Sequence, residues 1–386
     1  MNVPKLRFKE FTDEWCCFKL KELANIYLGV TYTPLYTKTG KTFISSKDIS
    51  KGYLDLSDVK YISEQEYNKI SINAKPNKGD VLFTRVGSNL GNPTVIETDI
   101  PLTIFVSLGY LRVNNKLNNY FSKFWMESYY FWHQVDMKVA GGAKQNLNTG
   151  WISKFDINIP NLQEQIKIAN MLQLLDKKIE LQSKKVKALK LYKLCLKEMM
   201  FFKAETSETK LSNVLNKWNE KNKNNQYSYV ESISNKHGFI AQNEQFDDRN
   251  IASNDKTNYY IIRKNVFAYN PSRLDVGSLA LKENDIISLV SPLYECFTTN
   301  QDVHFMYEWF NSKEFRKGTY SKFEGGVRNT LNFSNLCDIK ISLPSITEQN
   351  KISQILCIFN NKIKLEYDKY KSLLELKNGL MQSMFV

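Results

Sequence analysis

The sequence predicts an α+β fold in which two domains of mixed helix and strand alternate with two long helices that pair as an antiparallel coiled coil. The first observation is length, since 386 residues exceed the usual size of one domain. The second is composition, because 42% hydrophobic residues are enough to fill several cores. The third is an internal repeat, which divides the chain into two equivalent halves.

The repeat has a period of 184 residues, and short motifs recur along it in the same order. The matched positions include Gly141-Gly142 with Gly325-Gly326, Lys144 with Arg328, Leu147-Asn148 with Leu331-Asn332, Pro160 with Pro344, Glu164-Gln165 with Glu348-Gln349, Tyr110 with Tyr294, Phe121 with Phe305 and Trp125 with Trp309. Chance supplies one or two such matches. We therefore expect a duplicated module whose register is held without a gap from residue 106 to residue 201.

A heptad seam follows the proline that closes each half. Apolar residues recur at alternating steps of four and three, which is the spacing of a coiled coil. The predicted seam and partner-docking positions are Leu172, Leu175, Ile179, Val186 and Leu189 in the first helix, and Leu356, Phe359, Ile363, Tyr370 and Leu373 in the second. Polar residues interrupt both seams at equivalent places, Gln182 with Glu366 and Lys193 with Lys377.

Such seams do not stay exposed to water, so we expect the two helices to pack on each other. They should run antiparallel, because a whole domain is threaded between them. In the alternative, each helix packs on a separate core, and the matching polar interruptions argue against it. The predicted segments are 1–160 (first mixed domain), 161–203 (central helix), 204–344 (second mixed domain) and 345–386 (C-terminal helix).

Inside the two mixed domains, apolar runs and alternation predict the regular elements. The predicted strands are 42–49, 81–85, 103–113, 157–159, 259–262, 265–269 and 286–290. The predicted helices are 120–137 and 303–317.

The net charge of +13 favours a polyanionic partner, but it is unevenly distributed. Segment 204–344 carries 17 basic and 17 acidic residues, whereas 162–203 carries 10 and 4. The lysines of this first long helix are Lys177, Lys178, Lys184, Lys185, Lys187 and Lys190. They form a solvated face, a surface along a duplex, or a docking face for an acidic partner subunit.

Several classes of protein find no support in the sequence. The six cysteines form no CxxC pair and there are only three histidines, so we expect reduced cytoplasmic thiols and no metal site. Because the amino terminus is charged and has no apolar core, we do not expect a signal peptide, and no run is long and apolar enough to predict a membrane span. We find no P-loop and no Gly-rich turn for a methyl donor, so we predict no catalytic residues.

These motifs together resemble the specificity subunit of type I restriction–modification systems. The resemblance covers essentially the whole chain. Its carriers are Leu6-Arg7-Phe8-x-x-Phe11-x-x-x-Trp15, Gly79-Asp80-Val81-Leu82, the two Gly-Gly loops, the Glu-Gln helix starts, Tyr269-Asn270-Pro271-Ser272-Arg273 and Leu-x-x-x-Met-Phe at each helix end.

The resemblance implies a non-catalytic subunit with two target-recognition domains, each reading half of an asymmetric, interrupted sequence in double-stranded DNA. It implies as partners two adenine methyltransferase subunits and restriction/translocase subunits. S-adenosylmethionine, ATP and magnesium are then expected on those partners, and no cofactor on this chain. Two readings compete with it. One is a coiled-coil scaffold that reads no sequence, and the other is a self-sufficient enzyme, which needs several hundred further residues.

Candidate DNA-contact residues follow from the chemistry of base edges, which Arg and Lys read on guanine and Asn and Gln on adenine. Gly-rich loops also let the backbone approach a phosphate. The candidates are Arg85, Ser88, Asn89, Lys144, Gln145, Asn146, Tyr269, Asn270, Arg273, Arg328 and Asn329.

For three further groups of residues we favour a structural role. Tyr32, Tyr36 and Tyr229 are expected to be strand or core tyrosines rather than sugar contacts. Glu164 and Glu348 are expected to complement a helix dipole as first-turn carboxylates. Asn270-Pro271-Ser272-Arg273 differs at its fourth residue from the Asn-Pro-Pro-Tyr motif of adenine methyltransferases, so it is not assigned to catalysis.

Overall fold

The computed structural model describes residues 3–87, 89–138, 146–203, 205–235, 238–242, 255–274, 277–320, 322 and 330–386. The candidates Ser88, Lys144, Gln145, Arg328 and Asn329, together with both Gly-Gly pairs, lie outside these ranges. Contacts divide the chain into two units. Unit 1 comprises 1–185 and 366–386, and unit 2 comprises 186–365. Each unit therefore holds one mixed domain and a part of both long helices, a division that differs from the four predicted segments.

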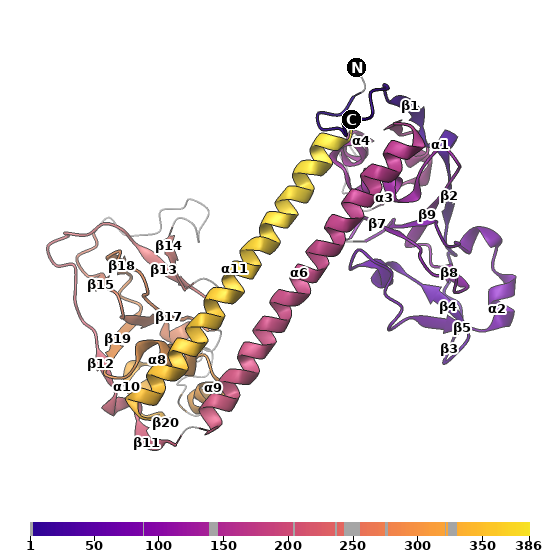
Figure 1. Cartoon of the computed structure of the whole chain (residues 1–386). Coiled ribbons are helices and arrows are strands. Elements are labelled where there is room, and N and C mark those ends of the chain that lie inside the picture. The colour runs from indigo at the N-terminus through magenta and orange to yellow at the C-terminus, as the bar shows by residue number, and fades with distance from the viewer. Residues whose placement is uncertain are drawn as a thin grey trace. The chain divides into compact units, whose positions relative to one another are not determined.

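The two long helices are α6 (Leu162–Lys203) and α11 (Ile346–Met384) (Figure 1). In unit 1, Asp176 of α6 contacts Lys377 of α11, and Gln182 contacts Glu366. Because the α11 number falls as the α6 number rises, the helices run antiparallel there. In unit 2 the ring of Tyr192 lies 5.4 Å from that of Phe359. The predicted pairing of the two helices is confirmed.

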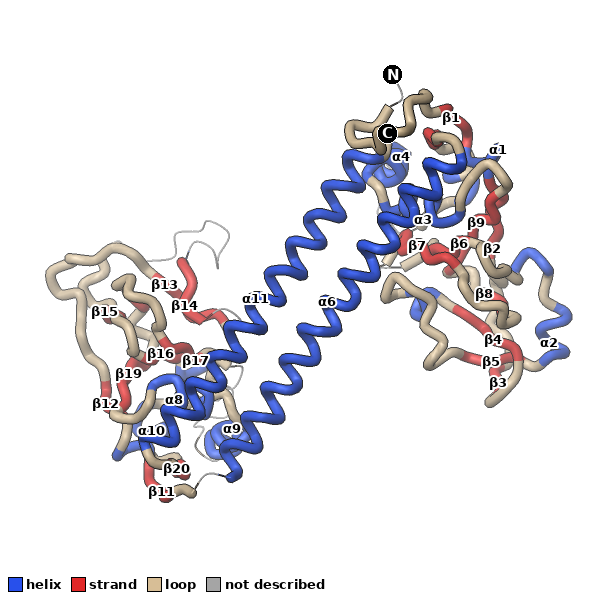
Figure 2. The backbone as a smooth tube through the Cα atoms, viewed as in Figure 1, coloured by secondary structure: helices blue, strands red, loops and turns tan. Residues whose placement is uncertain are grey.

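The described part of unit 1 contains ten strands and five short α-helices besides its parts of α6 and α11. Figure 2 shows the helices in blue and the strands in red. The strands are β1 (Cys16–Lys19), β2 (Ala24–Leu28), β3 (Tyr36–Thr37), β4 (Lys41–Ile44), β5 (Lys60–Ile62), β6 (Val81–Thr84), β7 (Gly91–Val95), β8 (Leu102–Ile104), β9 (Leu108–Val113) and β10 (Asp156–Ile159). The helices are α1 (Leu20–Leu23), α2 (Glu64–Lys69), α3 (Asn119–Glu127), α4 (Tyr129–Lys138) and α5 (Thr149–Ile152).

The described part of unit 2 repeats much of this order. The strands are β11 (Ser207–Lys210), β12 (Leu215–Lys217), β13 (Glu231–Ser234), β14 (Gly238–Ala241), β15 (Tyr260–Ile262), β16 (Phe267–Tyr269), β17 (Leu279–Leu281), β18 (Ser288–Val290), β19 (Glu295–Thr299) and β20 (Lys340–Leu343). The shorter helices are α8 (Val303–Phe310), α9 (Lys313–Tyr320) and α10 (Phe333–Cys337).

Each unit is built on an antiparallel four-stranded sheet with the same spatial order. The order is β2-β9-β6-β7 in unit 1 and β12-β19-β16-β17 in unit 2. A two-stranded sheet, β1-β10 or β11-β20, joins the start of each domain to its end. The units differ beyond this frame: unit 1 adds the sheet β3-β5-β4-β8, and unit 2 adds the pairs β13-β14 and β15-β18. The mixed α and β composition predicted from the sequence is confirmed.

One face of each four-stranded sheet packs against helices, including a long one. In unit 1 the main core joins Phe83 of β6 to Phe121 of α3 and Leu172 of α6. In unit 2 it joins Phe267 of β16 to Phe305 of α8 and Leu356 of α11. Each long helix is thus part of the core of the mixed domain whose end it follows.

The predicted helices 120–137 and 303–317 are each broken into two, at equivalent serines. Ser128 separates α3 from α4, and its hydroxyl donates a buried hydrogen bond to the carbonyl of Trp125 (2.6 Å). Ser312 precedes α9, and its hydroxyl accepts from the backbone N–H of Phe315 (3.2 Å). A serine that satisfies backbone groups locally permits such a break, which a periodicity of apolar residues does not reveal.

The repeat register also shifts upstream of α3, which corrects the expectation of an ungapped repeat. Leu147 N–H bonds to the carbonyl of Arg85 in unit 1, and Leu331 N–H bonds to that of Pro271 in unit 2. Arg85 and Pro271 are 186 positions apart. With this offset the β6–β9 pair Leu82–Tyr110 corresponds to the β16–β19 pair Ala268–Cys296. Tyr110 is therefore the counterpart of Cys296, and its predicted match to Tyr294 is wrong.

Two predicted strands are also shorter or interrupted. Segment 103–113 forms β8 and β9 with a turn between them, and 42–49 forms β4 followed by the 3₁₀ helix Ser46–Ile49. In that helix Ser45 and Asp48 form a capping box. This local hydrogen bonding ends the strand earlier than the apolar pattern suggests.

Candidate nucleic-acid interface

In unit 1 the exit of β6 meets the end of the Gly-Gly loop. Arg85 follows β6 directly, and its Nε donates to Asn146 Oδ1 at 3.1 Å although the two residues are 61 positions apart. Its Nη1 donates to the carbonyl of Val106 at 3.4 Å. Backbone bonds fix the same junction, from Arg85 N–H to Ser107 and from Leu147 N–H to Arg85. Two segments singled out in the sequence therefore lie together.

Arg85 keeps free guanidinium N–H donors that could contact DNA. The two side-chain bonds use two of the five N–H donors of its guanidinium, and they hold the group in place. Asn146 and Asn89 are exposed. A preoriented guanidinium beside exposed amides suits the bidentate reading of a base edge or a contact with phosphate.

Unit 2 forms the same junction with different side chains. Leu331, which follows the Gly325-Gly326 segment in the sequence, lies at the exit of β16, where its N–H donates to the carbonyl of Pro271 at 3.1 Å. Asn270 caps the 3₁₀ helix Pro271–Arg273, because its side-chain oxygen accepts from Ser272 N–H at 3.0 Å. The side chain of Arg273 is exposed. The equivalent edge of unit 2 thus presents arginine from a short helix rather than directly from the strand end.

One of the candidate contact residues is withdrawn. The side chain of Tyr269 is fully buried in the main core of unit 2, where its ring lies 6.2 Å from that of Phe297. Burial raises the pKa of its hydroxyl well above the ordinary value. A side chain with no exposed surface does not reach a duplex, so Tyr269 is assigned to the core. The sequence placed it wrongly because a strand of three residues leaves little alternation to read.

Three tyrosines were expected in strands or cores, and one of them is. Tyr36 lies in strand β3 as predicted, although it is 41% exposed. Tyr32 and Tyr229 lie outside the strands and are 48% and 43% exposed, so the expectation is wrong for these two. Tyr32 hydrogen-bonds Glu66 at 2.8 Å, and the ammonium of Lys60 lies 4.0 Å from the ring centre of Tyr36. Both are held at the surface by polar partners in neighbouring segments.

Two further exposed aromatics were missed by the sequence reading. Trp151 of α5 is 41% exposed, and α5 begins just after the Arg85–Asn146 junction with Asn148 as its N-cap. Tyr320 is 77% exposed at the end of α9. Exposed aromatics can stack on bases or pack on sugars. The sequence holds no signal for them, because heptad or strand spacing does not separate an exposed ring from a buried one.

Polar clusters interrupt the apolar contact of the paired helices at the positions where the sequence predicted polar seam residues. In unit 1 Lys377 contacts Asp176 (2.6 Å) and Glu127 (2.8 Å), and Lys123 contacts Asp176 (2.9 Å). Burial raises the pKa of Asp176, but the two lysines outweigh it and leave the pKa below its ordinary value. This cluster ties α6, α11 and α3 together at one place.

Unit 2 has a corresponding cluster around Glu308 of α8. The carboxylate of Glu308 contacts Lys193 at 2.6 Å and Lys197 at 3.2 Å. It also accepts a hydrogen bond from Asn360 of α11 at 3.3 Å. Burial lowers the pKa of Lys197. Lys193 of α6 therefore contacts a carboxylate of the second mixed domain, and Lys377 of α11 contacts one of the first. Each matched interruption pairs with the mixed domain of the unit in which it lies, not with the domain that its helix follows in sequence.

The remaining seam residues behave as coiled-coil positions. Leu172, Val186 and Leu356 are buried, and the other predicted seam residues are half-buried: Leu175, Ile179, Leu189, Phe359, Ile363, Tyr370 and Leu373. The predicted lysine face of α6 is exposed. Within it Lys184 pairs with Glu180 at 2.5 Å and Lys185 with Glu366 at 2.9 Å, so part of its charge is neutralised.

The two first-turn carboxylates of the long helices differ. Glu164 is fully buried and forms a bidentate pair with Arg7, both N–O distances being 2.7 Å. Glu348 is partly exposed and contacts Lys351 at 3.3 Å. A helix-dipole role alone is therefore incomplete for Glu164, whose carboxylate anchors the N-terminal Leu6-Arg7-Phe8 segment. Sequence reasoning did not assign a role to Arg7. Its place in the motif that begins Leu6-Arg7-Phe8 was the signal that could have identified it.

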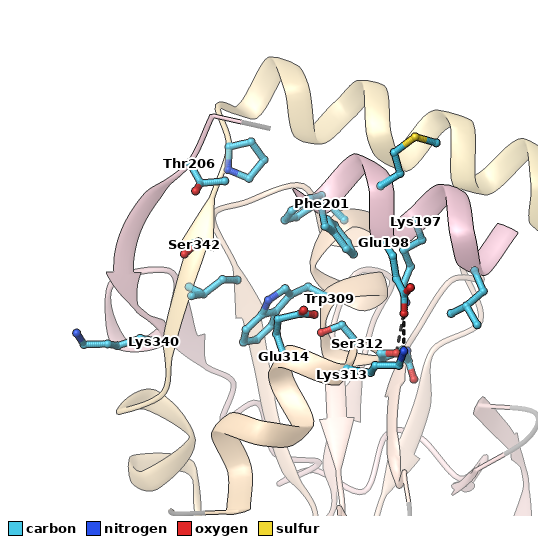
Figure 3. Close-up of a pocket in the computed structure, with 16 residues that line it drawn as sticks. Lys197, Glu198, Phe201, Thr206, Trp309, Ser312, Lys313, Glu314, Lys340 and Ser342 are labelled. Atoms are coloured by element: carbon cyan, nitrogen blue, oxygen red, sulfur yellow. Dashed lines mark hydrogen bonds and ion pairs between the residues drawn. The ribbon is translucent and has the colours of Figure 1, made fainter. Parts of the chain in front are cut away.

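A cavity of about 740 Å³ lies in unit 2 beside the end of α6 (Figure 3). Phe305, Trp309, Ile341 and Phe201 line it, and Lys313 pairs with Glu198 at 2.7 Å at its edge. None of the candidate DNA-contact residues lines it. The cavity is therefore separate from the candidate interface.

The equivalent place in unit 1 is filled by an aromatic side chain. The pairings Cys16–Ile159 and Ser207–Leu343 make Trp15 the counterpart of Thr206. Trp15 is buried, and its ring lies 5.8 Å from that of Phe121, the counterpart of Phe305. Thr206 lines the cavity of unit 2. Threonine at this position leaves open a space that tryptophan occupies in unit 1.

Among the described residues, none of the helices combines the length and apolar character needed to cross a bilayer. The same residues include no cluster of three or more His, Cys, Asp or Glu side chains arranged to hold a metal ion. What the fold does define is a duplicated module with a loop junction at the same sheet edge of each copy.

Comparison with known proteins shows the family to which the chain belongs. Residues 12–191 and 196–375 each match the family described as type I restriction modification DNA specificity domain. The two matches are offset by 184 residues, the period of the repeat. The chain belongs to this family and carries its domain in two copies.

Solved structures agree on the fold. A crystal structure of a type I restriction–modification system S subunit from M. genitalium matches with a TM-score of 0.60 at 15% identity, covering 100% of this chain and 99% of that one. A structure from a study of complex assembly and conformational transition of the type I R-M system matches with a TM-score of 0.58 at 14% identity, covering 96% and 97%.

Proposed function

We propose that this chain is the subunit that reads a bipartite, asymmetric DNA sequence and directs methyltransferase and restriction subunits to it, with no catalytic step of its own. The observation that carries the proposal is the duplicated junction. In each unit the exit of a central strand meets a residue that follows a Gly-Gly segment in the sequence, at Arg85–Leu147 and at Pro271–Leu331. A reader made twice fits a target with two halves.

The asymmetry of the target follows from the side chains at the two junctions. Unit 1 offers Arg85, Asn89 and Asn146, whereas unit 2 offers Asn270 and Arg273 on a short helix. Different donors and acceptors at equivalent positions select different base edges. Ser88, Lys144, Gln145, Arg328 and Asn329 belong to the same loops and remain proposed contacts.

Two docking sites for one kind of partner are supported by exposed apolar residues on the long helices. On α6, Leu174 and Leu181 are 70% and 57% exposed. On α11, Ile358 and Leu365 are 65% and 56% exposed, and they are the repeat equivalents of that pair. Each pair is spaced by one heptad, which suits an apolar stripe on a partner helix. We assign these pairs to two copies of an adenine methyltransferase subunit.

In the proposed assembly, the chemistry belongs to the partners. S-adenosylmethionine would bind the methyltransferase subunits, and ATP and magnesium would serve the restriction subunits. The chain itself would supply recognition and geometry inside the cytoplasm, where its targets and partners meet.

One experiment tests the proposal. The chain is expressed with and without an adenine methyltransferase partner, and modified adenines are mapped across a genome by single-molecule sequencing. We expect modification at one interrupted motif, and only with the partner. Modification by the chain alone would assign it an active site. Modification without a motif in the presence of a competent partner would favour the scaffold that reads no sequence.

A further inference from the structure

Gln165, in the first turn of α6, is a buried junction within unit 1. Its side chain is 1% exposed and makes three hydrogen bonds. Oε1 accepts from the backbone N–H of Asn118 at 2.8 Å. Nε2 donates to the carbonyls of Pro160 at 2.9 Å and Lys116 at 3.0 Å. One amide therefore joins the start of α6, the end of β10 and the segment that enters α3.

Gln349 of α11 repeats this arrangement in unit 2. It is fully buried, and its Oε1 accepts from the backbone N–H of Asp302 at 3.1 Å. Its Nε2 donates to the carbonyl of Pro344 at 2.9 Å and to Gln301 Oε1 at 2.9 Å. Asn118 and Asp302 are themselves the N-caps of α3 and α8. The same junction is thus built twice with a period of 184 residues.

All three partners of Gln165 are backbone groups, as are two of the three partners of Gln349. The glutamine grips the N–H of an N-cap residue that is Asn in one unit and Asp in the other, and the carbonyl of a proline. Such contacts do not depend on the side chains of the mixed domain. Replacing the glutamine would leave these buried backbone groups without hydrogen-bond partners, so the position admits few substitutes for glutamine.

The helix that begins at the glutamine's partner, α3 in unit 1 and α8 in unit 2, packs on the strand that precedes the candidate DNA-contact residues. Asn118 caps α3, whose Phe121 and Phe124 pack in the same core as Phe83 of β6. β6 ends at Thr84, and Arg85 follows it. The corresponding path in unit 2 runs from Asp302 through Phe305 to β16 and Arg273. A rigid packed path of this kind carries the orientation of the long helix to the loop junction.

We infer that Gln165 and Gln349 are positioning residues, each of which fixes the orientation of one reader on its long helix and thereby governs recognition of one half-site. This inference rests on the proposed function, because half-sites have meaning only if the chain reads DNA. Neither glutamine is proposed to contact DNA. Each acts through backbone groups of its own unit.

The experiment uses the full-length chain in complex with its methyltransferase partner. Gln165→Met and Gln349→Met remove the amide and keep most of the volume. Gln163→Met and Gln354→Met are matched controls, because both glutamines are exposed on the same helices. Affinity is measured for a duplex carrying the mapped target and for two duplexes in which one half-site or the other is scrambled.

We expect Gln165→Met to weaken binding to the intact target about tenfold. Scrambling the half-site read by unit 1 should then cost correspondingly less than in the unaltered protein, while scrambling the other half-site should cost the same. Gln349→Met should show the reverse pattern, and the controls should match the unaltered protein. Equal weakening of both half-sites, or none, would overturn the inference.

Hydrogen exchange keeps the inference testable apart from the proposed function. In Gln165→Met, the amides of 116–121 should lose protection while those of 301–305 keep it, and Gln349→Met should do the opposite. Unchanged exchange would show that the glutamine does not hold the segment. If the unaltered complex ignores both scrambled half-sites, the proposed function fails while the exchange result still stands. Gln165→Asn and Gln349→Asn, which shorten the side chain, replace the methionine variants if those do not fold.

Discussion

Gln182 of α6 and Glu366 of α11 hydrogen-bond to each other, with Nε2 of the glutamine 2.7 Å from Oε2 of the glutamate. The two residues are 184 positions apart, so each occupies the other's place in the repeat. The helices therefore meet at equivalent positions in unit 1. Lys185 and Lys369 approach the same carboxylate at 2.9 and 3.5 Å. A glutamine amide therefore faces a glutamate carboxylate. Two glutamates at these positions would repel each other, so the contact favours pairing of α6 with α11 over pairing of two copies of α11.

Acidification should weaken this contact. The hydrogen bond from Gln182 and the pairing with Lys185 lower the pKa of Glu366 from 4.5 to about 2. A carboxyl whose pKa is depressed in the folded state contributes stability above its unfolded pKa and loses it as the pH falls through the folded pKa. Thermal unfolding followed from pH 5 to pH 2 should show a loss that is smaller in Glu366→Gln. An equal loss in both proteins would assign the acid sensitivity elsewhere.

Arg85→Ala should weaken reading of a single half-site. If Arg85 contacts a base, the loss is about 1–3 kcal/mol at the half-site read by unit 1. Binding to duplexes with either half-site scrambled, measured by fluorescence anisotropy at fixed salt, separates the two halves. Lys69→Ala removes an exposed positive charge from the same unit and serves as the control. A uniform loss across all duplexes would make Arg85 a phosphate contact rather than a base reader.

Arg273→Ala should produce the complementary loss, in the half-site read by unit 2. Its exposed side chain follows β16 on a short helix capped by Asn270. The expected cost is again about 1–3 kcal/mol for a base contact. The same set of duplexes measures it. The assignment of readers to half-sites fails if Arg85→Ala and Arg273→Ala affect the same half.

Leu181→Asp and Leu365→Asp should each remove one of two methyltransferase subunits. Both leucines are exposed and equivalent in the repeat, and a carboxylate in an apolar contact is costly to desolvate. Native mass spectrometry of the assembled complex should give one bound subunit for either variant and none for the double variant. Lys178→Asp, at another exposed position of α6, controls for added negative charge. Two bound subunits in all variants would place docking elsewhere.

Thr206→Trp should stabilise unit 2. Its counterpart Trp15 is buried against Phe121 in unit 1, whereas Thr206 borders a cavity of about 740 Å³. Filling apolar space of this kind contributes about 1 kcal/mol. Differential scanning calorimetry measures the change, and Glu205→Trp places the same ring at the adjacent exposed residue. Destabilisation by Thr206→Trp alone would mean that the cavity cannot accept the ring.

The sequence by itself determined the two helices, their pairing and the duplication. Heptad spacing is a local periodicity, and a repeat of 184 residues is visible as identity at a fixed offset, so neither needs tertiary information. The matched interruptions Lys193 and Lys377 were also visible at equivalent heptad positions, although the carboxylates that they contact were not.

Only the tertiary structure decided which segments meet. Arg85 and Asn146 are 61 residues apart, and sheet topology rather than spacing brings them within 3.1 Å. Tyr269 and Tyr32 exchanged their expected environments because burial depends on what covers a strand, not on the residue type alone. The glutamines after Glu164 and Glu348 gave no chemical signal in sequence, since a buried amide gains its role from backbone groups that the fold delivers to it.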